Sequence, residues 1–110
     1  MRFSPVLPIC REALGYPIGF ATPDGLTRIT ERAEALGYFA VVPNEHLCTP
    51  HVLRDDTQRP PSFFEPLVTC ASLAARTRCI RLLPGLVVLP LRDPVLLAKQ
   101  VTTLDHLDRR

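Results

Sequence analysis

The chain has 110 residues, of which 46% are hydrophobic and 22% charged, and its formal net charge is +2. This length allows one domain with a small core, and the composition is typical of a globular protein. The small net charge, without basic runs interleaved with aromatic residues, argues against nucleic-acid or membrane-surface partners. No apolar stretch of ~20 residues is present and prolines interrupt the N-terminal segment, so we expect neither a membrane span nor a signal peptide, and predict a cytoplasmic protein.

The first predicted elements are a strand over about residues 3–9, a helix over about 23–37 and a short buried strand over 39–42. The helix prediction depends on Thr22-Pro23-Asp24, which combines a cap, a first-turn proline and an acidic residue. Apolar residues then recur at helical spacing, and Gly37 fits the left-handed residue that ends many helices. Two prolines in the first strand donate no ladder hydrogen bond, which argues against a fully paired central strand.

A polar loop is predicted over residues 43–61. Loops of this length without secondary structure are uncommon in compact domains and are often functional. A second helix follows over about 63–77, and its first residue stays open. Ser62-x-x-Glu65 has the form of a capping box, whereas Pro66 also fits as the first helical residue.

The third unit combines a strand over about residues 80–89 with a helix over about 94–107. The strand segment is nearly all apolar, which suits a strand buried on both faces. Asp93-Pro94 provides a cap and a first-turn proline for the helix. Its apolar stripe consists of Leu97, Val101, Leu104 and Leu107. The threefold alternation of strand and helix predicts an α/β fold with parallel strands and right-handed crossovers.

Several histidine and cysteine residues are candidate metal ligands. His46-x-Cys48-x-x-His51, together with Cys10, has ligand types that suit zinc, but the spacing matches no zinc signature. We therefore predict no metal site. Without a secretion signal, the four cysteines are expected to be reduced and mostly buried. The sequence also contains no GxGxxG, P-loop or serine-nucleophile motif.

Four stretches carry a resemblance to a known family. They are Ala-Glu-Ala-Leu-Gly-Tyr (33–38), Val-Pro-Asn-Glu-His-Leu (42–47), Leu-Ala-Ala-Arg-Thr-Arg-Cys-Ile-Arg-Leu (73–82), and Asp-Pro-Val-Leu-Leu-Ala-Lys-Gln (93–100) with Thr-Leu-Asp (103–105). In this order and spacing, the chain resembles the N-terminal part of the bacterial-luciferase-like family of flavin- or coenzyme F420-dependent oxidoreductases. The resemblance extends from about residue 3 to residue 110.

The resemblance implies a TIM-type (β/α)8 barrel with the cofactor at the carboxyl ends of the strands. It implies monooxygenation by reduced flavin and oxygen, or hydride transfer by F420, on a small organic substrate; FMN and F420 stay open. By position, His46 is the expected catalytic residue. Asn44 and Glu45 are expected to hold the isoalloxazine edge or the histidine. The Gly85–Leu86 peptide falls where the family often has a strained cis peptide behind the isoalloxazine ring.

Four further residues lie at or near the rim of the implied barrel. Arg92-Asp93 is interpreted as a plain helix cap rather than a contact to an anionic cofactor tail. Asp105 is expected to be a structural partner of a neighbouring loop. Cys10, at the end of the first strand, is likewise expected to be structural.

The chain departs from the family pattern in two places and in length. It has Leu82-Leu83-Pro84 where the family usually has Leu-Gly-Thr, and it reads Leu-Asp-Arg-Arg (107–110) instead of Ser-Gly-Gly-Arg. A barrel of this kind needs about 250 residues. We therefore expect three βα units of a truncated barrel, inactive alone, that self-associate or need a complementing chain. The alternative is a non-catalytic flavin-binding remnant.

Overall fold

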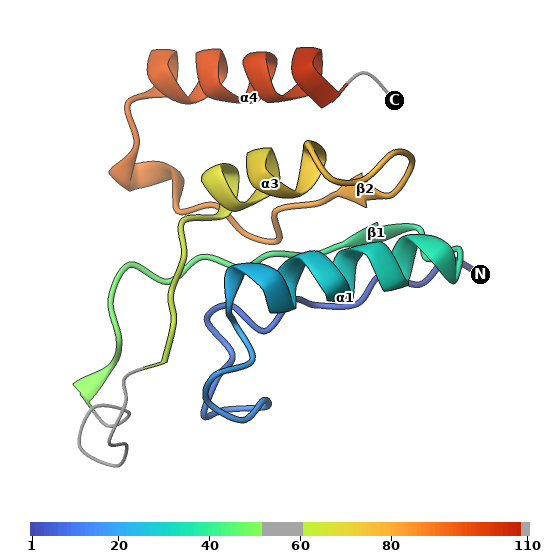
Figure 1. Cartoon of the computed structure of the whole chain (residues 1–110). Helices are drawn as coiled ribbons and strands as arrows, with labels where there is room; N and C mark the ends of the chain where they lie inside the picture. Colours follow the sequence, from blue (N-terminus) through green and yellow to red (C-terminus); the bar gives the residue numbers. More distant parts are fainter. Residues whose placement is uncertain (52–60, 109–110) are drawn as a thin grey trace.

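The computed structural model describes residues 1–51 and 61–108 (Figure 1). The elements in chain order are α1 (Pro23–Ala35), β1 (Ala40–Val41), α3 (Pro66–Ala74), β2 (Arg81–Leu82), the short 3-10 helix η1 (Leu89–Leu91) and α4 (Pro94–Asp108). Helix α3 lies between α1 and α4 and contacts both (Figure 1). Residues 52–60 of the predicted 43–61 loop lie outside the described part of the chain.

The sheet is short and parallel. β1 and β2 pair with Ala40 opposite Arg81 and Val41 opposite Leu82. On the other side of β1, the extended N-terminal segment forms a parallel bridge between Val6 and Val42. β1 therefore lies between the N-terminal segment and β2. The structure is an α/β arrangement of parallel extended segments connected through helices, as the alternation in the sequence predicts.

The N-terminal segment pairs less than the predicted strand over residues 3–9. Its ladder is reduced to the one bridge, with hydrogen bonds from the Leu7 N–H to the Val42 carbonyl at 2.9 Å and from the Val42 N–H to the Pro5 carbonyl at 3.0 Å. Pro5 and Pro8 have no N–H to donate, so the segment cannot form a continuous ladder.

The predicted strand over residues 80–89 was too long. Regular pairing is confined to Arg81–Leu82, and the chain then leaves the sheet toward η1. Pro84 removes a donor, although the Gly85 N–H still reaches the Pro43 carbonyl at 2.9 Å. Val87 and Val88 are half-buried, so this apolar run is not covered on both faces.

Each long helix begins at a proline preceded by a capping side chain. The Thr22 hydroxyl accepts from the Gly25 N–H at 3.0 Å, and the Asp93 carboxylate accepts from the Leu96 N–H at 2.8 Å. At α3 the cap is Glu65, whose carboxylate accepts from the Val68 N–H at 2.6 Å. Such caps satisfy backbone donors that have no intrahelical partner. The second helix therefore begins at Pro66 and not at Ser62.

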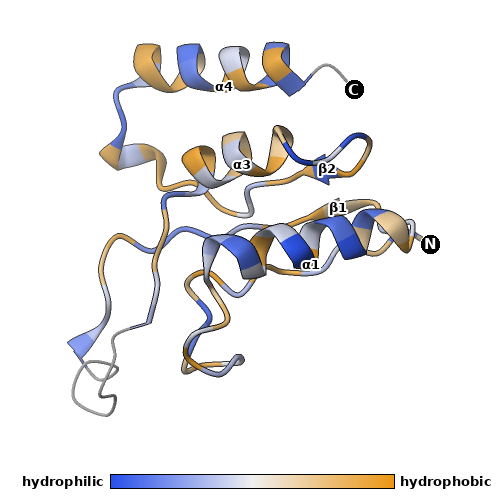
Figure 2. Cartoon of the chain, viewed as in Figure 1, coloured by the Kyte–Doolittle hydropathy of each residue, from blue (hydrophilic) through white to orange (hydrophobic). Residues whose placement is uncertain are grey.

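The buried core lies between α1, α3 and the sheet. Its residues are Leu7, Ile9, Ala21, Leu26, Ala33, Val41, Leu73 and Ile80. Figure 2 shows the hydrophobic and hydrophilic residues alternating along α1, whose hydrophobic stripe faces this core. Burial of these side chains is the main favourable contribution to folding.

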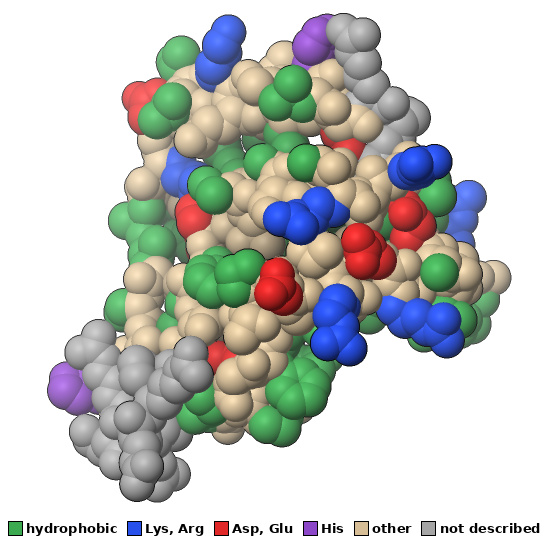
Figure 3. All heavy atoms as spheres, in the orientation of Figure 1, with side chains coloured by type: hydrophobic (Ala, Val, Ile, Leu, Met, Phe, Trp, Pro, Cys, Tyr) green, Lys and Arg blue, Asp and Glu red, His purple; other side chains and the backbone are tan. Residues whose placement is uncertain are grey.

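The predicted apolar stripe of α4 is not buried. Leu97 and Leu104 are half-buried, whereas Val101 and Leu107 are exposed. Helix α4 contacts α3, which covers only one side of the helix. Figure 3 shows hydrophobic side chains exposed on the viewed face, including along α4 and the segment before it. Within the described residues, no helix has the length and apolar character needed to cross a membrane.

Candidate functional site

The candidate site lies at the carboxyl ends of β1 and β2, where the predicted residues 44–46 and 85–86 come together. The two segments are held side by side by hydrogen bonds from the Leu83 N–H to the Val41 carbonyl at 3.0 Å and from the Gly85 N–H to the Pro43 carbonyl at 2.9 Å. The carboxyl ends of parallel strands are where open α/β sheets and barrels bind ligands.

Asn44 connects this site to the segment that follows the N-terminal strand region. In the amide orientation that satisfies both of its polar atoms, the side-chain nitrogen donates to the Gly85 carbonyl at 3.0 Å. The side-chain oxygen then accepts from Arg11 Nε at 3.1 Å. Asn44 was predicted to contact a cofactor, but its amide is already bonded within the chain.

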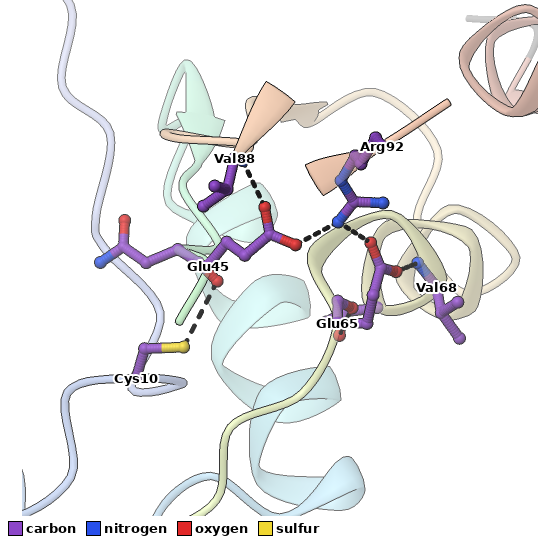
Figure 4. Close-up of polar contacts among 8 residues, drawn as sticks. Cys10, Glu45, Glu65, Val68, Val88 and Arg92 are labelled. Carbon is purple, nitrogen blue, oxygen red and sulfur yellow. Dashed lines mark hydrogen bonds and ion pairs between the residues drawn. The ribbon is translucent and has the colours of Figure 1, made fainter. Parts of the chain in front are cut away.

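Glu45 belongs to an ion cluster centred on Arg92, which lies between the buried Glu45 and the partly exposed Glu65 (Figure 4). Arg92 Nη2 pairs with Glu45 Oε1 and lies 2.7 Å from Glu65 Oε1. The second carboxylate oxygen of Glu45 accepts from the Val88 N–H. The side chains of Glu45, Arg92 and Glu65 are 4%, 17% and 37% exposed.

The Arg92 guanidinium stays charged in this setting. Burial disfavours its charge, but the hydrogen bonds that it donates to Glu65 and Glu45, together with the attraction of both carboxylates, outweigh burial and raise the pKa of Arg92. Arg92 was considered as a contact to an anionic cofactor tail. Two carboxylates already contact its Nη2 atom, so an anionic cofactor tail would compete with them for the guanidinium.

His46 is exposed at the end of this segment. Its ring lies against Phe63, with ring centroids 5.7 Å apart and an interplanar angle of 39°. Leu86 is also exposed, at 56%. The site therefore presents an imidazole in contact with an aromatic ring, next in sequence to polar groups that are bonded internally.

The predicted cis peptide at Gly85–Leu86 is wrong for this structure, which has no cis peptide bond in its described part. A cis bond that does not precede proline costs about 2.5–4 kcal/mol, so it persists only where surrounding contacts impose it.

Cys10 lies beneath the site as a buried thiol. Its Sγ donates to the Asn44 carbonyl at 3.6 Å, and its backbone is in the left-handed region, with φ 59°. Burial raises the pKa of Cys10 to about 11; the hydrogen bond with the His46 backbone lowers the pKa and the Glu45 charge raises it. Cys10 is therefore a neutral thiol at physiological pH.

Two further polar residues that were predicted at the rim lie on or next to α4. Asp93 caps α4, as described above, and Asp105 lines a hollow of about 560 Å³ between α4 and the sheet, together with Phe39 and Arg81. Within residues 1–51 and 61–108, no three His, Cys, Asp or Glu side chains are grouped so as to hold a metal ion.

The sequence interpretation missed Glu12, which is buried beside the site. Its carboxylate accepts three backbone hydrogen bonds at 2.7 Å, from Gly19, Ala21 and Ser62. These bonds connect the loop before α1, which contains Glu12, Gly19 and Ala21, to Ser62, four residues before α3 begins. Only the position of a lone acidic residue in a Gly- and Pro-rich segment could have indicated it, and that signal is weak.

The residues present fit a flat flavin-type cofactor in part. The exposed His46 and the half-buried Phe63 ring beside it offer an aromatic surface with one imidazole, and Leu86 is a separate exposed apolar side chain. Asn44 and Glu45 fit a supporting role instead, because their side-chain atoms are occupied by partners within the chain.

These features define an α/β protein of the class that places its site at the carboxyl end of a parallel sheet. Residues 1–109 match the family model of luciferase-like monooxygenases, and the chain belongs to this family. No curated protein matches the chain.

Among solved structures, the chain is similar to the monooxygenase RslO1 from Streptomyces bottropensis, with a TM-score of 0.69 and 23% sequence identity. The similarity covers 98% of this chain and 30% of RslO1. At this level of identity the likeness shows a shared fold. The chain spans less than a third of the length of that monooxygenase.

Proposed function

We propose that the chain supplies the first part of the active site of a luciferase-like oxidoreductase, which uses reduced FMN or coenzyme F420 on a small organic substrate. The observation that carries the proposal is the exposed His46 beside Phe63 at the carboxyl end of β1. Its neighbours Asn44 and Glu45 are held by hydrogen bonds and an ion pair within the chain. A site that depends on one reactive group needs such support to keep that group in place.

In this proposal the residues of the chain have separate tasks. The bound cofactor supplies the electrons for the reaction. His46 holds or transfers a proton at a ring nitrogen, because an imidazole can act as a general acid or base. Phe63 and Leu86 provide the apolar surface on which a flat ring can rest. Glu45 and Asn44 keep the segment that carries His46 in place.

We further propose that the site needs more polypeptide than these 110 residues, either as a continuation of the chain or as a complementing chain. In the described part of the structure, β2 has a partner strand on one side only. Large apolar side chains around it are exposed, including Leu83, Leu89 and Leu91. An unpaired strand beside exposed apolar side chains is typical of a surface that another segment covers.

The test compares the 110-residue chain with its possible continuation. The DNA after codon 110 is read in all three frames, and the chain is expressed alone and with any further βα units found there. Oxidation of reduced FMN and of reduced F420 is then measured against the rate in free solution. We expect turnover from the extended protein and none from the 110 residues. Steady turnover by the 110 residues would contradict the need for further polypeptide.

The role of His46 is tested in the active form with His46→Gln. Loss of a general acid or base lowers turnover by about 10²–10⁴-fold. His106→Gln, on α4, is the matched control and is expected to leave turnover unchanged. Equal turnover of the two variants would overturn the role of His46. Retention of flavin through purification without turnover by any form would favour a non-catalytic flavin-binding protein instead.

A further inference from the structure

Arg92 connects three segments that are far apart in the sequence. It follows η1, and its guanidinium pairs with Glu45 after β1 and with Glu65 at the start of α3. Glu45 in turn accepts from the Val88 N–H on the segment before η1. Figure 4 shows Arg92 reaching across to both carboxylates.

Both carboxylates lie next to residues of the candidate site. Glu45 directly precedes His46, and Glu65 is two residues after Phe63, whose ring contacts His46. Arg92 therefore holds the backbone that carries the imidazole and also the segment that carries its aromatic neighbour. A change at Arg92 acts on the two sides of the His46–Phe63 contact together.

The burial of Glu45 makes this connection strong. Its side chain is 4% exposed, and its two oxygens are bonded to Arg92 and to the Val88 N–H. Without the guanidinium, a nearly buried carboxylate would keep a single neutral donor. Such a group is strongly disfavoured and is expected to move toward water. Because Glu45 and His46 are consecutive residues, that movement displaces the imidazole.

The helix starts do not need Arg92. Glu65 caps α3 with Oε2, through the Val68 N–H, and contacts Arg92 with the other oxygen. Asp93 caps α4 through the Leu96 N–H. Capping of the two helices therefore does not account for the ion pairs of Arg92 with Glu45 and Glu65.

We infer that Arg92 is the positioning residue of the site, which fixes the orientation of His46 against Phe63 through Glu45 and Glu65. This inference rests on the proposed function for the catalytic role of His46, but the contacts of Arg92 that carry it do not depend on any cofactor. Arg92 itself touches neither substrate nor cofactor in this assignment.

The test measures the ring of His46 by NMR in the cofactor-free 110-residue chain. The wild-type chain is expected to show nuclear Overhauser contacts between the His46 and Phe63 rings, and a ring-current shift of the His46 carbon-bound protons. Arg92→Met is expected to lose both signals. Arg92→Lys keeps the charge without the planar fork of donors and is expected to retain them in part.

Arg81→Met is the matched control, because it removes the same charge from an arginine that stacks on Phe39 elsewhere on the sheet. It is expected to leave the His46 signals unchanged. Unchanged His46 signals in a folded Arg92→Met chain would overturn the inference. So would equal losses in Arg92→Met and Arg81→Met, since that result indicates general loosening of the fold.

A measurement on the wild-type chain covers the case in which Arg92→Met does not fold. The Val88 N–H donates to the Glu45 carboxylate and is expected to exchange slowly with solvent. In Arg92→Lys, its exchange is expected to accelerate more than that of Leu73 in α3. Fast exchange in the wild type, or equal acceleration at both amides, would overturn the inference. If Arg92→Met changes the His46 signals as expected but no form of the protein shows turnover, only the proposed function is refuted and the inference about Arg92 stands.

Discussion

The carboxylate of Glu34, near the end of α1, accepts a hydrogen bond from the Ile80 N–H at 2.9 Å, at the entry to β2. The same oxygen accepts from the Cys79 N–H at 2.6 Å and from the Arg78 N–H at 2.8 Å. Three consecutive backbone donors thus converge on one side chain. Glu34 fixes the turn between α3 and β2 against the end of α1.

Stability should fall in acid through Glu34. The backbone hydrogen bonds of Cys79 and Ile80 are the main cause that lowers the pKa of Glu34 to about 2. An ordinary glutamate binds its proton near pH 4.5. The unfolded chain therefore takes up a proton first, and the contribution of Glu34 to stability is lost as pH falls from about 4.5 to 2.

Glu34→Gln is expected to remove this contribution. The loss at pH 7 should be about 1 kcal/mol, because solvent screens a carboxylate that is only half-buried. Urea unfolding at pH 7, 4 and 3 measures it. The difference between wild type and variant should shrink toward low pH, and a difference that stays constant with pH would contradict the assignment.

The four cysteines should react with thiol reagents in two groups. Cys48 and Cys79 are exposed, whereas Cys10 and Cys70 are buried. The raised pKa of Cys10, about 11, keeps it as an unreactive thiol at pH 8. Alkylation at pH 8 followed by peptide mass spectrometry should label the first pair in the native chain and all four in urea. Rapid native labelling of Cys10 would contradict the described packing.

Gly85 should tolerate no side chain. A Cβ at this position would lie 2.6 Å from Val42 Cγ1, on a neighbouring segment of the sheet. Gly85→Ala should lower the free energy of unfolding by about 1–3 kcal/mol, the usual cost of overpacking. Gly15→Ala is the control, because nothing lies within 4 Å of its Cβ position. The double variant with Val42→Ala should recover part of the loss, and no recovery would count against a direct clash.

The exposed apolar side chains near β2 and α4 should make the 110-residue chain self-associate. Leu91 and Leu96 are 62% and 57% exposed. Sedimentation velocity should show association that Leu96→Glu reduces, because a charge in an apolar contact is costly. Leu14→Glu, in the loop before α1, is the matched control and should not change it. Equal effects of both substitutions would exclude a specific association surface.

The starts of α1 and α4 could be predicted from the sequence because their signals are local, whereas two local signals competed at α3 and left its start open. Thr22, Glu65 and Asp93 each precede a proline and cap the turn that follows. The lengths of the strands could not be predicted in the same way. An apolar run becomes a strand only where a neighbour pairs with it, and the prolines at 5, 8 and 84 interrupt that pairing.

The supporting groups of the site were also beyond sequence reasoning. Glu45 and Arg92 are 47 residues apart, and the three donors to Glu12 come from two separate segments. No periodicity or motif spacing links such pairs. The position of His46 came from the resemblance to the family, and its contact with Phe63 came only from the structure.

Cofactor binding at the carboxyl end of the sheet is tested most directly by titrating the isotope-labelled protein, together with the further polypeptide that makes it active, with FMN and, separately, with F420, while following every amide by NMR. Arg2 and Arg81 both lie over the Phe39 ring, each 4.6 Å from its centroid, and this pair of cations is an alternative attractive position for an anionic ring system. We predict that the shifts concentrate at residues 44–46, 63 and 85–88. Shifts concentrated at Arg2, Phe39 and Arg81 instead would contradict the proposed site.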